Sequence, residues 1–243
     1  MATAATYGCF AGVRLLNVVE DLISFDGDLA GSGFWEFLAQ EFPSVSTPFD
    51  DKKPQSAMNG LDALMSVLLP GIVTIPSLMI NSTSFNPGSL LTQDRTADSN
   101  SYLIFLSMGL LGSLESRYGL PTSNYHKSID LPWATAENTV GDGCAFASGL
   151  LNLYDGLTYV GNNSAPSVAE IYQTIASFLS DGLDASCTIG CQTCAALGAS
   201  VSCTSCPTTL KNRDSCTGAI TDVNSCAAAG IVMFVNATWS GPP

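Results

Sequence analysis

The sequence predicts an all-α fold, an irregular bundle of about seven helices with a disulfide-rich segment near the C-terminus. Apolar residues recur at three- and four-residue spacing along most of the chain, as they do on the buried face of a helix. No segment alternates apolar and polar residues as a half-buried strand does. The connections are short and no linker interrupts them, so we expect one domain over residues 1–243.

The expected helices follow from this spacing and from the residues that end them. Phe10, Val13 and Leu16 begin an apolar stripe that predicts a first helix over 5–25. Pro43 ends the next helix, because proline cannot continue the helical hydrogen bonds. The later helices are expected over 33–42, 56–69, 100–118, 137–159, 167–183 and 218–235.

The charge balance excludes several kinds of partner. The chain has 21 acidic and 8 basic residues, a formal net charge of −13, and its bases never form more than a pair. A nucleic-acid surface needs clustered lysine and arginine, so we expect no nucleic-acid partner. Only 12% of residues are charged while 46% are hydrophobic, which favours an exported protein or a surface covered by a partner.

The cysteines also indicate export. Seven of the nine lie within forty residues near the C-terminus, a density typical of an oxidising compartment. We expect four disulfides, with the segment 187–216 as a stapled subregion and Cys9 left over because it is far from the others in sequence. The eight expected partners are Cys144, Cys187, Cys191, Cys194, Cys203, Cys206, Cys216 and Cys226. Eight cysteines allow 105 pairings, so the sequence leaves their connectivity open.

Two metal alternatives compete for these cysteines. The spacing of Cys187, Cys191 and Cys194 matches an iron–sulfur triad such as that of radical enzymes that use S-adenosylmethionine, although this chain lacks their βα barrel. Cys191, Cys194, Cys203 and Cys206 form two CxxC pairs with the look of a zinc site. A redox-active CxxC is a third alternative, without the βαβ context it requires. Disulfides are favoured because they also use the cysteines outside the pairs, so we expect no metal and no cofactor.

Cys9 is a candidate lipidation site. The residues Thr6-Tyr7-Gly8-Cys9 resemble the lipobox of bacterial lipoproteins, which implies a lipid on the cysteine; only Gly8 fits that pattern well. A buried or bridged cysteine is the alternative. A membrane contact could also involve the uncharged segment 63–80, but Pro70 and Pro76 interrupt it, which favours a core helix followed by a buried extended segment.

Other motifs have simpler explanations. Asp26-Gly27-Asp28-Leu29-Ala30-Gly31 resembles half of an EF-hand calcium loop, but lacks the fifth ligand and the bidentate glutamate, so a polar turn is favoured. His126 is the only histidine and has no nucleophile elbow nearby. Asp142 and Asp155 lie on an apolar helix, where capping or a buried hydrogen bond is expected rather than catalysis. Asn81, Asn162 and Asn236 begin glycosylation sequons, which we expect in loops or at helix ends.

These observations predict a non-enzymatic, exported cell-envelope protein that acts as a structural or scaffold subunit of a larger assembly. The expected compartment is the periplasm, the outer membrane or the cell surface, and the expected partners are proteins. The alternative is a helical carrier of lipid or another apolar ligand, with residues 61–80 lining its cavity. An enzyme using scattered carboxylates is a third alternative.

Overall fold

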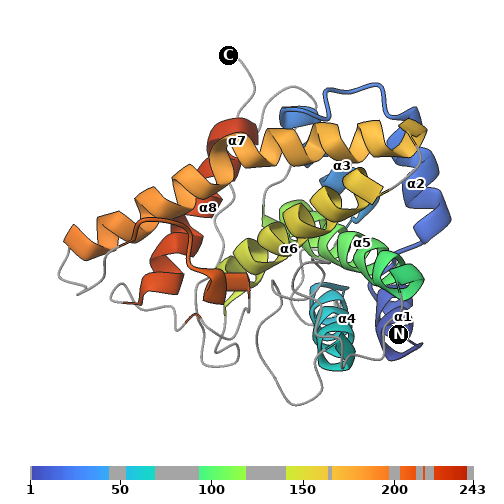
Figure 1. The fold of residues 1–243 in the computed structure, drawn as a ribbon, viewed down its shortest axis with the longest axis horizontal. Helices are drawn as coiled ribbons and strands as arrows, with labels where there is room; N and C mark the ends of the chain where they lie inside the picture. The colour runs from blue at the N-terminus through green and yellow to red at the C-terminus, as the bar shows by residue number, and fades with distance from the viewer. Residues whose placement is uncertain are drawn as a thin grey trace.

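The computed structural model describes residues 2–43, 53–68, 93–118, 141–163, 166–196, 203–211, 216 and 222–239, and within these ranges all regular structure is helical (Figure 1). The elements are α1 (Ala2–Phe10), α2 (Leu15–Ser24), α3 (Ser32–Glu41), α4 (Lys53–Leu68), α5 (Gln93–Tyr118), α6 (Asp142–Asn163), α7 (Pro166–Ala196), the 3-10 helix η3 (Thr208–Lys211) and α8 (Val223–Trp239). The all-α prediction is confirmed, with eight α-helices described where about seven were expected.

The predicted helix over 5–25 is wrong at its centre, where the chain turns between α1 and α2. Gly12 has φ +83°, a left-handed conformation that glycine adopts without steric cost. Its N–H donates to the Cys9 carbonyl and the Val13 N–H donates to the Gly8 carbonyl, which together form a Schellman motif. This motif ends α1, although the apolar spacing continues across the break.

The helix predicted over 167–183 also differs, because α7 continues to Ala196. This longer helix contains two glycines, Gly182 and Gly190, although glycine has a low intrinsic helix propensity. In the structure both lie against α8, where the absence of a side chain allows close packing. Packing against a neighbour therefore outweighs the low helix propensity of glycine here.

The centre of the molecule is α5, which packs against α3, α4 and α6. Its residues from Leu103 to Glu115 are all buried, as expected of a helix surrounded by others. The long helix α7 crosses one side of the molecule, and α8 lies against its C-terminal part (Figure 1). Contacts of α6 with both α5 and α7 join these two groups of helices.

Among the described helices, none has the length and apolarity needed to cross a membrane. The segment 63–80 falls partly on α4, which ends at Leu68, and residues 69–80 lie outside the described part of the chain.

The contact between α5 and α3 predicts the effect of a small substitution. A Cβ at Gly112 would overlap the backbone oxygen of Leu38, so Gly112→Ala should force the helices apart and lower the free energy of unfolding by about 1–3 kcal/mol. Gly8→Ala is the matched control, because its nearest neighbour is the flexible tip of Leu106 at 3.4 Å. Urea unfolding should show Gly8→Ala to be neutral or stabilising; equal effects of the two changes would contradict the packing described.

Candidate functional site

The most elaborate part of the described structure is the cysteine-rich region at the C-terminal end of α7. Cys187, Cys191 and Cys194 are spaced four and three residues apart on this helix, so they share one face. All three are buried, with exposed fractions of 5% or less. The CxxxCxxC spacing resembles that of an iron–sulfur triad, but here it aligns the three cysteines along one face of α7.

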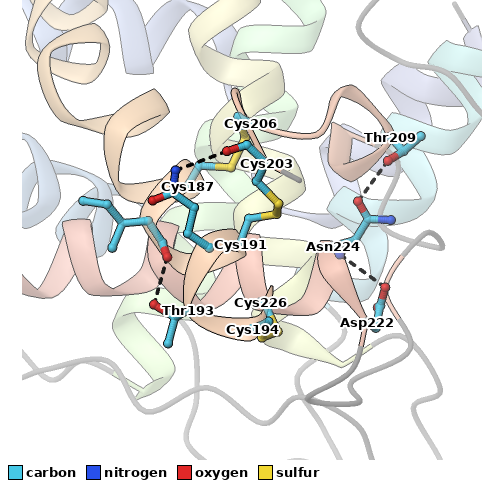
Figure 2. The surroundings of a disulfide bond; sticks show 12 residues. Cys187, Cys191, Thr193, Cys194, Cys203, Cys206, Thr209, Asp222, Asn224 and Cys226 are labelled. Atoms are coloured by element: carbon cyan, nitrogen blue, oxygen red, sulfur yellow. Dashed lines mark hydrogen bonds between the residues drawn. A yellow bond between two sulfur atoms is a disulfide. The ribbon is translucent and has the colours of Figure 1, made fainter. Parts of the chain in front are cut away.

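Each cysteine of the stripe has a different partner (Figure 2). Cys187 pairs with Cys206 and Cys191 with Cys203, so the segment 203–206 runs antiparallel to α7. Cys194 pairs with Cys226 of α8. The Cα–Cα distances of 5.3 to 6.0 Å are those of ordinary disulfides.

A fourth bridge connects this region to the middle of the molecule. Cys144, in the first turn of α6, pairs with Cys216 across 72 residues of sequence, with their Cα atoms 6.0 Å apart. The cross-linked region therefore extends beyond 187–216 to α6 and α8. The prediction of disulfides is confirmed. Cys9, which lies outside the cross-linked region, is exposed and forms no bridge.

Two glycines allow α7 and α8 to approach closely beside the Cys194–Cys226 bridge. A Cβ at Gly190 would overlap the Cys226 carbonyl oxygen and lie 2.7 Å from the Gly230 nitrogen. A Cβ at Gly230 would overlap the Ser186 carbonyl oxygen. The two backbones are thus in direct contact, and this contact holds Cys194 and Cys226 at bridging distance.

Hydrogen bonds brace the segments that the disulfides connect. Asp184 accepts from the Cys206 N–H at 3.1 Å, and Gln192 donates to the Cys203 carbonyl at 3.2 Å. Asp222 caps the start of α8 by accepting from the N–H groups of Asn224 and Ser225 at 3.2 and 3.3 Å. Thr209 of η3 donates to the Asn224 side chain at 2.9 Å (Figure 2).

This connectivity removes the thiolates on which the metal alternatives depend. The four sulfurs of the zinc-like pattern are divided among three bridges, and only Cys191 and Cys203 are bonded to each other. Nowhere in the described ranges do three or more histidine, cysteine, aspartate or glutamate side chains gather as a metal site requires. The disulfides of this region cross-link α6, α7 and α8 through the segments between them.

The EF-hand-like segment forms a local turn before α3. Asp28 accepts the Ala30 N–H at 2.9 Å, and its own carbonyl accepts the Gly31 N–H at 3.2 Å. Gly33 packs on the same backbone, where a Cβ would lie 2.7 Å from the Asp28 oxygen. The Asp28 carboxylate thus takes part in shaping the turn.

The two helical aspartates are separated in the structure. Asp142 accepts a 2.5 Å hydrogen bond from the Tyr118 hydroxyl, which joins the end of α5 to the start of α6. Burial and then this bond raise the pKa of Tyr118 far above its usual range. Asp155 lies more than three turns away and is half-buried. Asp142 is therefore a hydrogen-bond partner, one of the roles expected from sequence.

The remaining sequence candidates are dispersed. Asn162 is exposed at the end of α6, and Asn236 is half-buried in the last turns of α8. Thr238, the third residue of that sequon, accepts a 3.0 Å hydrogen bond from the Trp35 ring nitrogen. Asn81 and His126 lie outside the described residues. Of these remaining candidates, the described ones, Asp142, Asp155, Asn162 and Asn236, do not share a common site.

Sequence reasoning missed one buried acid, Glu115 of α5. Its side chain is fully buried, and neither carboxylate oxygen has a hydrogen-bond partner in the described structure. Burial therefore raises the pKa of Glu115 well above its usual range. Its position directly after Leu114, in a helix whose apolar residues surround it, was the available signal.

Two grooves are open on the described surface. One, of about 390 Å³, lies between the α1–α2 turn and α5 and is mostly apolar; Cys9, Leu16 and Phe105 are among its lining residues. The other, of about 640 Å³, runs along the N-terminal half of α7.

No protein-family model, no curated protein and no solved structure matches this chain.

The disulfides should contribute unequally to stability. In the chain-entropy model a bridge stabilises more when it closes a longer loop, so replacing Cys144 and Cys216 with alanine should cost about 1.5 kcal/mol more than replacing Cys191 and Cys203. The two bridges span 72 and 12 residues, and all four cysteines are buried. Denaturant unfolding measures the difference, with Cys9→Ser as a neutral control. A larger loss from the short bridge would contradict this order.

Glu115 should make stability depend on pH. Its pKa is raised in the folded state, so the unfolded chain loses this proton first and stability falls as pH rises above the ordinary glutamate value of 4.5. Glu115→Gln removes this penalty and should raise the melting temperature at pH 7 by a few degrees, with a smaller effect at pH 4. Calorimetry at the two pH values tests this. A lower melting temperature of Glu115→Gln at pH 7 would contradict the prediction and show that other groups stabilise the buried Glu115 side chain.

Proposed function

We propose that the chain is an exported, non-enzymatic structural subunit of a larger assembly in the cell envelope. The observation that carries this proposal is the exposure of large apolar side chains on the first two helices. Phe10, Leu16 and Ile23 are 68%, 85% and 60% exposed. Water contact with three such side chains is unfavourable, and burying each against a partner would contribute about 1.5–3 kcal/mol.

The surroundings of Leu16 make this an extended surface rather than a single exposed residue. Leu16 lies at the rim of the apolar groove that Val13, Phe105 and Leu106 also line. Arg14 is the one charged residue among the described lining. An exposed apolar side chain beside an apolar groove is a feature of interaction sites.

The disulfides support the proposed export to an oxidising compartment. Four bridges persist in an oxidising compartment and are rare where thiols are kept reduced. The periplasm, the outer membrane and the cell surface meet this condition. A lipid on Cys9 would place the apolar groove at a membrane surface, since Cys9 lines that groove.

A second candidate function is a carrier of a lipid or another apolar ligand. The same groove, at about 390 Å³, falls within the size range of small-molecule sites. It differs from the cavity predicted over 61–80, because the described residues Leu61 and Leu64 are buried in the core.

The substitution Leu16→Ser tests whether the exposed Leu16 side chain contacts a partner protein. Because the side chain is 85% exposed, the fold should be unaffected, while proteins that copurify with the natively expressed chain at fixed stoichiometry should be lost. Met233→Ser is the matched control, since Met233 is 68% exposed on α8. Quantitative mass spectrometry of the purified complex reads the result.

Equal recovery of partners with both variants would contradict a role for this surface. Stoichiometric extractable lipid without a protein partner would favour the carrier.

A further inference from the structure

We propose that the groove along the N-terminal half of α7 binds a basic, extended segment of a partner protein. This inference rests on the proposed role in an assembly, but it concerns a different surface. The groove occupies about 640 Å³, and its α7 wall is formed by Glu170, Gln173, Thr174, Ser177, Phe178 and Asp181. These positions follow the three- and four-residue spacing of one helix face. Ala30 and Phe234 are among the residues that complete the lining.

The floor of the groove is aromatic and fixed in position. The Phe178 ring lies 5.9 Å from that of Phe234 and 5.7 Å from that of Trp35, centroid to centroid. Trp35 is held by its hydrogen bond to Thr238, which also lines the groove. Because Phe178 is only half-buried, its ring offers an apolar contact to a side chain entering the groove.

The charge of the groove has one sign. Glu170 and Asp181 are exposed carboxylates at either end of the α7 wall, and no base is among the described lining residues. In a chain of net charge −13 this surface attracts cations and repels anionic membranes. The complementary occupant is a segment with lysine or arginine.

The spacing of the two carboxylates indicates an extended peptide. Eleven residues of α-helix separate them, a rise of about 16 Å. An extended chain advances about 3.3 Å per residue and alternates its side chains between two faces, so basic residues six positions apart, about 20 Å, would share one face and reach both acids through their long side chains. Between them an apolar residue would lie over Phe178. A small diffusible amine is too short to contact both Glu170 and Asp181 and also cover the aromatic rings between them.

The test uses the whole chain and a fluorescein-labelled peptide, Gly-Lys-Ser-Phe-Ser-Ser-Ser-Lys-Gly, whose lysines and phenylalanine share one face when it is extended, with binding followed by fluorescence anisotropy at low salt. We expect Glu170→Gln combined with Asp181→Asn to weaken binding about tenfold, the effect of losing two exposed ion pairs. Ser177→Trp, which fills the groove without a charge change, should abolish binding.

Two matched variants control for charge and bulk. Glu20→Gln with Asp21→Asn removes two exposed acids from α2, and Ser180→Trp adds bulk to α7 outside the groove lining. Both should bind the peptide as the unaltered chain does, and circular dichroism verifies that every variant is folded. Equal weakening by the two acid pairs would assign the attraction to overall charge and overturn the proposal, as would no binding at millimolar peptide. Copurification with Leu16→Ser tests the assembly role separately, so either inference can fail alone.

Discussion

The direct backbone contact between α7 and α8 determines how the C-terminal half of the molecule is built. Gly190 and Gly230 leave no side chain between the two helices, which places Cys194 within bridging distance of Cys226. Along the same helix face, Cys191 and Cys187 bind the returning segment. A helix of 31 residues is thus held along its C-terminal part by covalent bonds, in a region with little apolar side-chain volume of its own.

The N-terminal part of α7 is held differently, by aromatic packing. Phe178 lies between Phe34 and Trp35 of α3 and Phe234 of α8, with ring centroids 5.7 to 6.4 Å apart. This cluster connects α3, α7 and α8, and its outer edge forms the floor of the acidic groove. The floor of the groove is therefore held by packing among three helices, whereas the C-terminal part of α7 is held by disulfides.

The helical class and the eight bridged cysteines could be predicted from sequence because helical periodicity and cysteine density are local signals. The connectivity could not, since it depends on which helices touch; the pairing of Cys144 with Cys216 follows from the position of α6 in the fold. The Gly12 turn and the continuation of α7 through Gly182 and Gly190 were missed for one reason. Glycine ends a helix in the first case and permits close packing in the second, and only tertiary contacts distinguish these roles. The groove was also invisible in sequence, because its aromatic floor combines Phe178 of α7 with Phe234 of α8, 56 positions apart in the chain.

The most direct test of the disulfide-bonded structure is the mass of the natively purified protein under non-reducing conditions, after alkylation of free thiols, followed by peptic mapping of the bridges. The four bridges predict a chain lighter by eight hydrogens than its reduced form, with Cys9 as the sole cysteine not held in a bridge. They also predict peptides that join Cys187 to Cys206 and Cys194 to Cys226. Nine alkylated cysteines would contradict this bridged structure and remove the argument for export.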